Sequence, residues 1–358
     1  MTISLSHGGG QTVYSSPTLS DEAWVGTTNG IVRIRRSGGA WAVDGRMLEG
    51  KHIHALVFEP RSGTWLCGVR KDGIYASTDA GKSWAKRDEG VDQHNIYSIS
   101  AVEEAGKVVL YAGTEPAHAY RSDDLGASWR ELGGLRENDM SGWRFPAPPH
   151  DAHLKHISFE PGNPKVVYGS IEQGGCYRSE DAGKSWTEIP GMYADVHRVI
   201  MTPADPQRLI ITGGQGLWLS RDRGAHWDNI FTRGSEYGGY PDQLVYRPSD
   251  PQTMVVSAGR KSPPAWREET AQARFSRTHD AGETWTVLTG GLPEYMPHSI
   301  EAMCLEEAAD GTTQILAATT GGSVLWTGDM GDSWRTIIEG LSPISKGHHF
   351  EGLVGARG

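Results

Sequence analysis

The sequence predicts an all-β fold, a β-propeller of seven blades in a single domain spanning residues 1–358. The main observation is an eight-residue phrase, Ser/Thr-x-Asp-x-Gly-x-Ser/Thr-Trp, that recurs along the chain. Its aspartates are Asp79, Asp124, Asp181, Asp222, Asp280 and Asp329, at intervals of 45, 57, 41, 58 and 49 residues. These intervals suit a four-stranded blade with loops of variable length. A degenerate copy that lacks the aspartate, Ser37 to Trp41, indicates a further blade.

Each copy of the phrase is expected to be a hairpin turn, because strand-like residues flank it. The aspartate can accept backbone N–H groups across the turn. The glycine allows a positive φ, and the tryptophan buries a large apolar surface. A calcium loop would need more acidic residues per turn. We therefore expect a structural role for the phrase, not a catalytic one.

The blades follow one another along the chain. Their expected boundaries are 23–50 together with 349–357, then 51–92, 93–150, 151–193, 194–238, 239–296 and 297–345. Residues 23–50 contain three strand-like runs but no inner strand. The C-terminal segment 349–357 aligns with the inner strands of the other blades. We expect it to supply the innermost strand of the first blade and so close the ring, which pairs open sheet edges.

The repeated phrase is known as the Asp-box, or bacterial neuraminidase repeat. The chain resembles Asp-box β-propellers: sialidases, sortilin-type receptors, xyloglucanases and photosystem assembly factors. The resemblance extends over nearly the whole chain and implies the fold, whereas one propeller scaffold hosts many activities. Sialidase activity is not implied, because Arg33-Ile34-Arg35 lacks the proline of the sialidase Arg-Ile-Pro motif.

Composition restricts the partners. The net charge is −10 and the sequence pI is about 5.8. A nucleic-acid partner is not expected, because phosphate binding requires a basic surface. The three cysteines, Cys67, Cys176 and Cys304, lie far apart and are expected to be reduced core thiols. No secretory signal and no membrane-spanning run is seen, so a soluble cytoplasmic protein is expected. The oligomeric state is left open.

Aligning the inner strands produces two columns that are polar in every blade. One column is His54, Tyr97, Lys155, His197, Asp242, Glu301 and Glu351. The column two residues earlier is His52, Asn95, His153, Asp195, Tyr240, Ser299 and His349. The residues between the two columns are apolar. Since strand side chains alternate with period two, both polar columns should face the central channel. A wet channel without function would explain polarity alone, but histidines and carboxylates are ligand and proton-transfer groups.

The histidines of the two columns suggest a divalent transition metal as cofactor. The expected ligands are His52, His54, His153, His197 and His349. Imidazoles with a carboxylate suit such an ion. A bound metal lowers the pKa of its water to about 7 and so supplies hydroxide at neutral pH. The expected ligands or general bases among the carboxylates are Glu301, Glu351 and Asp242.

Other polar and aromatic residues are expected to bind the substrate. They are Tyr97, Lys155, Arg260, Trp143 and Tyr240. Arg260 and Trp143 belong to two long insertions, 259–273 and 135–152, which we expect to be ordered lids over the channel mouth.

The favoured function from sequence is a metal-assisted hydrolase or lyase acting on a small polar or anionic substrate. One alternative is a glycoside hydrolase, which needs two carboxylates about 5–9 Å apart. Asp242, Glu301 and Glu351 come from consecutive inner strands and are candidates for that pair. Another alternative is a non-catalytic binding or assembly propeller.

Overall fold

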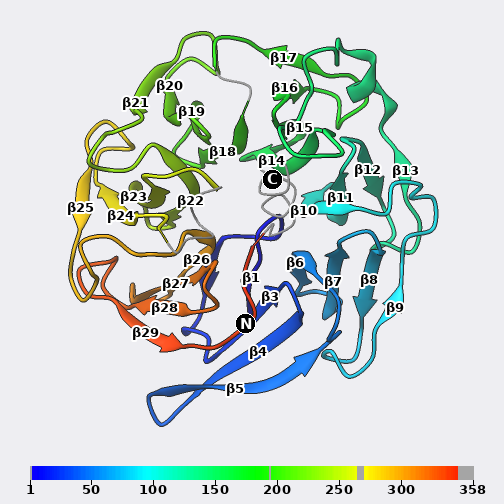
Figure 1. Ribbon diagram of the computed structural model, residues 1–358. Helices are drawn as coiled ribbons and strands as arrows, with labels where there is room; N and C mark the ends of the chain where they lie inside the picture. The colour runs from blue at the N-terminus through cyan, green and yellow to red at the C-terminus, as the bar shows by residue number, and fades with distance from the viewer. Residues whose placement is uncertain (1, 193–194, 264–269, 346–358) are drawn as a thin grey trace.

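Seven β-sheets surround a central axis in the computed structural model, which describes residues 2–192, 195–263 and 270–345 (Figure 1). Six sheets have four strands and one has five. These ranges contain one 3-10 helix, η1 (Gly133–Glu137), and no α-helix. Accordingly, no helix in the described ranges has the length and apolar character needed to cross a membrane. The predicted all-β, seven-bladed propeller is confirmed.

The first four blades follow the order of the chain. The first contains β1 (Ile3–Leu5), β3 (Glu22–Thr27), β4 (Gly30–Ser37) and β5 (Ala40–Met47). The second contains β6 (Ile53–Glu59), β7 (Thr64–Val69), β8 (Gly73–Ser77) and β9 (Ala85–Lys86). The third contains β10 (Ile96–Glu104), β11 (Lys107–Thr114), β12 (Ala119–Ser122) and β13 (Arg130–Glu131). The fourth contains β14 (His153–Glu160), β15 (Asn163–Glu172), β16 (Gly175–Ser179) and β17 (Thr187–Ile189).

The last three blades complete the ring. The fifth contains β18 (Val196–Thr202), β19 (Asp205–Gly213), β20 (Gly216–Ser220) and β21 (Asp228–Phe231). The sixth contains β22 (Tyr240–Arg247), β23 (Asp250–Gly259), β24 (Ala273–Thr278) and β25 (Thr286–Leu288). The seventh contains β2 (Val13–Ser16), β26 (Ile300–Ala308), β27 (Thr313–Thr319), β28 (Val324–Thr327) and β29 (Arg335–Ile338).

The Asp-box phrase forms the predicted hydrogen-bonded turn. Asp79 Oδ1 accepts hydrogen bonds from the Ser77 hydroxyl at 2.8 Å and the Ser83 N–H at 2.9 Å, and Oδ2 accepts from the Ser83 hydroxyl at 2.7 Å. Gly81 has a φ of +81°, a backbone angle that residues with a side chain rarely adopt. In the fourth copy His226 takes the place of the hydroxyl residue, with Nδ1 2.6 Å from Asp222 Oδ2. The box aspartates are thus occupied by their own turns, as expected.

The core lies in the sheets and between neighbouring blades. Trp24 of the first blade stacks on Trp65 of the second, with ring centroids 4.0 Å apart. Phe275 of the sixth blade stacks on the Asp-box tryptophan Trp334 of the seventh at 4.1 Å. The cysteines Cys67, Cys176 and Cys304 are buried and none forms a disulfide; burial raises the pKa of each thiol. The expectation of reduced core thiols agrees with this arrangement.

The inner edge of the first blade differs from the prediction. β1 pairs in parallel with β3, with Ile3 opposite Ala23 and Leu5 opposite Val25. The N-terminal segment therefore holds the place that we expected residues 349–357 to take; those residues lie outside the described ranges. All three residues of β1 are buried, which explains why so short a strand is stable there. β2 then adds in parallel to β26, the inner strand of the last blade.

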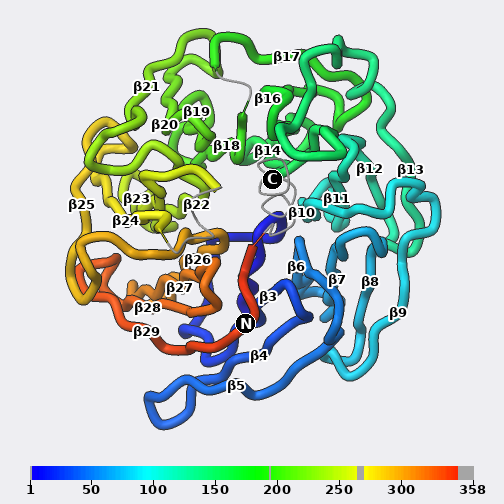
Figure 2. The backbone as a smooth tube through the Cα atoms, in the orientation of Figure 1, coloured from blue at the N-terminus to red at the C-terminus, as the bar shows by residue number. Residues whose placement is uncertain are grey.

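Between β1 and β2 the chain passes through the central channel, as the dark-blue segment at the centre of Figure 2 shows. Gly8 donates its N–H to the His54 carbonyl at 2.7 Å, and Gly10 donates to the Ile99 carbonyl at 3.0 Å. A Cβ at Gly8 would lie 1.8 Å from the Tyr97 carbonyl oxygen, so glycine is required for this approach. The first and last blades are joined through this segment.

Candidate functional site

A β-bulge near the start of six of the seven inner strands positions the site residues. In the second blade Ile53 pairs with Val69 and Ala55 pairs with Gly68, which leaves His54 as the extra residue. The same irregularity occurs in five further inner strands. The extra residues there are Tyr97, Lys155, His197, Asp242 with Gln243, and Glu301. Bulges re-aim side chains and are common beside functional sites. Here they bring one polar residue from each of six blades to the axis.

Rings from different blades contact one another around the channel. The His52 and His54 ring centroids are 4.5 Å apart, and His54 lies 4.8 Å from Tyr97. Tyr97 stacks on His153 of the next blade at 3.9 Å. On the other side His197 lies 4.8 Å from Tyr240. All these side chains are buried. The structure thus brings together most of the sequence-predicted site residues that it describes.

A chain of charged groups continues across the blades. His153 lies between two carboxylates, with Nδ1 3.4 Å from Glu115 Oε2 and Nε2 3.0 Å from Glu172 Oε2. The Lys155 ammonium lies 3.3 Å from Glu172 Oε2 and 3.4 Å from Asp242 Oδ1. Lys155 is 1 % exposed and contacts two carboxylates, so its charge is already balanced inside the protein.

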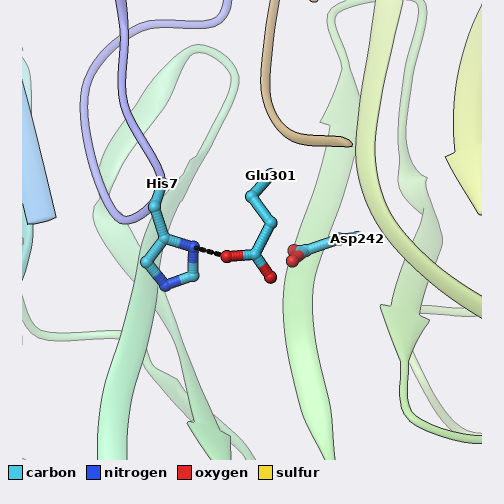
Figure 3. A group of neighbouring side chains, drawn as sticks. All are labelled: His7, Asp242 and Glu301. Atoms are coloured by element: carbon cyan, nitrogen blue, oxygen red, sulfur yellow. Dashed lines mark ion pairs between the residues drawn. The ribbon is translucent and has the colours of Figure 1, made fainter. Parts of the chain in front are cut away.

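His7 from the N-terminal segment meets two carboxylates from the inner strands β22 and β26. Its Nδ1 lies 3.6 Å from Glu301 Oε2, and Asp242 lies beside Glu301 (Figure 3). Ligand atoms of His7, Asp242 and Glu301 all lie within 4.8 Å of one another. Arg198, also buried, donates Nη2 to the His7 carbonyl at 2.6 Å. Burial lowers the pKa of Arg198, and Asp242 and Glu301 act against that effect.

Glu115 stands at the end of the second strand of the third blade. Burial raises the pKa of its carboxyl group; His153 and Arg70 oppose this shift, and Asp151 and Glu172 add to it. A carboxyl group with a raised pKa keeps its proton to a higher pH than an exposed one does.

Sequence reasoning missed four of these channel residues. Glu115 and Glu172 lie where second strands end, so aligning the second strands as well as the inner ones would have found them. Arg198 directly follows the bulge residue His197, at a position where the residue types differ between blades, so no pattern marks it. His7 has only the Gly8-Gly9-Gly10 run beside it as a signal of close backbone approach.

Two predicted substrate residues lie in other contacts. Trp143 donates Nε1 to the Tyr177 hydroxyl at 3.0 Å, and the two rings pack edge to face at 5.3 Å. Arg260 donates to the Tyr295 hydroxyl at 3.0 Å and lies 5.2 Å from the centre of that ring. Phe145, from the same insertion as Trp143, lies 5.1 Å from His153. Through Phe145 the insertion therefore packs against the imidazole of His153. Glu351 and His349 lie outside the described residues, as does Trp266 of the other insertion.

Sequence comparison relates the chain to two groups of proteins. A family model described as sortilin, neurotensin receptor 3, matches residues 174–296. A xyloglucanase from Paenibacillus sp is 25% identical over 264 residues, covering 65% of this chain and 24% of the relative. A xyloglucanase from Hypocrea jecorina is 24% identical over 291 residues, covering 70% of this chain and 32% of the relative. The chain thus spans about a quarter to a third of the length of these relatives.

Solved structures of similar fold include a GH74 xyloglucanase and YCF48 bound to a peptide. The GH74 xyloglucanase from Xanthomonas campestris aligns with TM-score 0.65 and 19% identity over 94% of this chain and 55% of that one. YCF48 bound to D1 peptide aligns with TM-score 0.60 and 16% identity over 88% of this chain and 91% of that one. At these identities the likeness concerns the fold. Together with the six Asp-box turns and the seven sheets, it shows that the chain is a seven-bladed β-propeller of the Asp-box type.

Proposed function

We propose that the protein is a glycoside hydrolase-like propeller that acts on a glycan, with Asp242 and Glu301 as its catalytic carboxylates. The observation that carries the proposal is the short distance between the two side chains: a carboxylate oxygen of Asp242 and one of Glu301 lie within 4.8 Å of each other. Retaining glycosidases place two carboxyl groups about 5–5.5 Å apart. The xyloglucanase relatives, aligned over about two thirds of the chain, support a glycan as substrate.

The surroundings suggest different roles for the two carboxylates. Lys155 lies 3.4 Å from Asp242 and favours its ionised form, which suits a nucleophile. Glu301 lies beside that charge and 3.6 Å from His7, a group able to exchange a proton with it. Glu301 would protonate the leaving sugar oxygen, and Asp242 would form the glycosyl–enzyme bond that water then cleaves. Glu301 would take the proton from that water.

The direction of approach follows from the N-terminal segment. Residues 8–10 hydrogen-bond to the inner strands β6 and β10 and occupy the channel. In this proposal a glycan would come from the face where the inner strands begin, and side chains that bury Asp242 and Glu301 would have to move to admit it. This proposal replaces the small anionic substrate expected from sequence. Lys155, which was expected to bind that anion, already contacts Glu172 and Asp242.

The test is hydrolysis of xyloglucan, cello-oligosaccharides and aryl β-glucosides by the purified full chain. Glu301→Gln and Asp242→Asn are each expected to lower kcat at least about 100-fold, because each removes a proton-transfer or nucleophilic group. Glu307→Gln is the control, since this residue lies on the same strand but its carboxylate accepts hydrogen bonds from Ser249. Equal activity of all three folded variants and the parent would refute the assignment.

A non-catalytic binding propeller is the second candidate. YCF48, solved with a bound peptide, matches this chain over 91% of its own length, whereas the alignment covers 55% of the Xanthomonas enzyme. This observation favours a single propeller that binds a peptide. Calorimetry with glycans and with peptide libraries separates the candidates: peptide binding without turnover of any glycan supports the second.

A further inference from the structure

A second group of ligand-type side chains lies between the fourth and fifth blades. Glu172 ends β15, Asp195 pairs with it through an isolated β-bridge, and His197 is the bulge residue of β18. Ligand atoms of the three lie within 4.8 Å of one another. Their residues are 2%, 8% and 0% exposed, respectively. The group shares no residue with the Asp242–Glu301 pair, although Lys155 contacts both Glu172 and Asp242, and its function does not depend on that pair being catalytic.

The tautomer of His197 is determined by its backbone neighbour. Nδ1 lies 2.8 Å from the Pro241 carbonyl oxygen, which can only accept, so Nδ1 carries a proton. In a neutral imidazole Nε2 then presents a lone pair. Metal-binding histidines commonly donate their other ring N–H in this way, often to a backbone carbonyl.

His197 Nε2 faces Asp195 Oδ1 at 3.4 Å, and in the described ranges neither buried atom has a hydrogen-bond partner. Two lone pairs facing each other away from water require a cation between them, either a proton or a metal ion. A charge-assisted N–H···O bond is shorter, about 2.7–2.9 Å. Two ligands bound at about 2.1 Å to a tetrahedral ion lie about 3.4 Å apart. The separation therefore favours a shared metal ion.

The neighbouring groups form a built site. His153 Nε2 and Lys155 Nζ contact Glu172 Oε2 at 3.0 and 3.3 Å and orient this carboxylate. A Cβ at Gly214 would lie 1.9 Å from Asp195 Oδ2, so this glycine makes room for the Asp195 side chain. The two carboxylates can balance the charge of one divalent ion.

We propose that Glu172, Asp195 and His197 bind one divalent transition-metal ion, with zinc as the best-suited candidate. One histidine and two carboxylates suit such an ion, and a water molecule would complete four ligands. Of the five histidines predicted as ligands, the proposal retains His197. It also uses two carboxylates, Glu172 and Asp195, that were not predicted as ligands.

The experiment uses the full chain, stripped with a chelator and titrated with Zn²⁺ or Co²⁺. We expect uptake of about one equivalent, a rise in Tm because the ion binds the folded state, and a visible absorption of Co²⁺ typical of tetrahedral coordination. His197→Gln and the isosteric Asp195→Asn should each weaken binding at least about 100-fold, beyond the 10–100-fold loss typical of an outer-shell partner.

Two controls address the other histidines of the channel. His54→Gln and His7→Gln should leave the metal affinity unchanged, since neither residue belongs to the proposed site. Loss of binding in His7→Gln with normal binding in Asp195→Asn would overturn the proposal. Uptake below about 0.2 equivalents by the folded parent, without a rise in Tm, would also overturn it and indicate a protonated His197 paired with Asp195. No outcome depends on glycan hydrolysis.

Discussion

Individual glycines determine how closely the N-terminal segment can approach the inner strands. Gly9 lies against β6 and β10: a Cβ there would be 2.6 Å from Ala55 Cβ and 2.9 Å from the Ile99 carbonyl oxygen. Real Cβ atoms do not approach backbone so closely, so a larger residue would have to push the segment out of the channel. At this position the absence of a side chain is a packing requirement, separate from the conformational freedom of glycine.

Gly9→Ala is expected to lower the free energy of unfolding by about 1–3 kcal/mol, the usual cost of overpacking a filled core. Urea unfolding followed by tryptophan fluorescence would measure the change. Gly142→Ala is the matched control, because its Cβ would meet no atom within 4 Å. The control is expected to stay within about 0.5 kcal/mol of the parent. If the Gly9 variant were as stable as the control, the N-terminal segment would not be packed tightly against β6 and β10.

At the scale of elements, two local devices recur around the ring. The bulge in the inner strand turns one side chain toward the axis, as it does for His54 and Glu301. The Asp-box ties the outer hairpin of a blade through its aspartate. Hydrogen bonds from the Ser83 hydroxyl, the Ser83 N–H and the Ser77 hydroxyl lower the pKa of Asp79 to about 2. Folding therefore favours the ionised form of this carboxylate.

Because the folded-state pKa of Asp79 is below its ordinary value of 3.8, the stabilisation is present above about pH 4 and is lost as the pH falls toward 2. Asp79→Asn should therefore lower Tm at pH 7, and the difference from the parent should shrink between pH 4 and 2. Calorimetry across this range would measure it. Asp332→Asn should change Tm little at any pH, because the Asp332 carboxylate that pairs with Arg277 is 65% exposed. A constant difference for Asp79→Asn would disprove the linkage.

At the scale of the whole molecule, a buried carboxylate fastens the N-terminal segment to the last blade. Glu306, on β26, is 0% exposed. It accepts hydrogen bonds from the Ser16 hydroxyl, the Ser20 N–H and the Gln314 amide, each at 2.8 Å. These contacts join residues 16–20 to the seventh sheet, beside the parallel pairing of β2 with β26. Removing the carboxylate would leave the Ser20 N–H and one Gln314 amide N–H without this buried acceptor, while the Ser16 hydroxyl could still donate to the Thr18 carbonyl at 2.9 Å.

Glu306→Ala is expected to lower the free energy of unfolding by about 3 kcal/mol or more, since hydrogen bonds to charged groups contribute about 1.5–3 kcal/mol each. Denaturant titration would measure it. Glu103→Ala should have little effect, because its carboxylate forms an exposed pair with Arg61. Equal losses in the two variants would show that Glu306 does not hold the ring together.

The sequence was sufficient for the parts of the fold that repeat. Six inner strands could be located because each carries two polar positions around an apolar one, and the ring then brought His54, Tyr97 and His153 together. The inner strand of the first blade could not be located, since Ile3–Leu5 is too short for a periodic signal and pairs in parallel. Glu172 lies outside this pattern, because it ends the second strand of its blade. The chemical roles of the channel residues are still predictions.

The path of the N-terminal segment has a consequence for biosynthesis. Ser16 and its partner Glu306 are separated by 290 residues, so translation produces β1 and β2 long before the strand that receives β2. β1 can pair with β3 soon after synthesis, whereas β2 stays without its partner strand β26 until the seventh blade emerges. Products that stop short of residue 300 would lack β26 altogether and expose β2 to aggregation or to proteases.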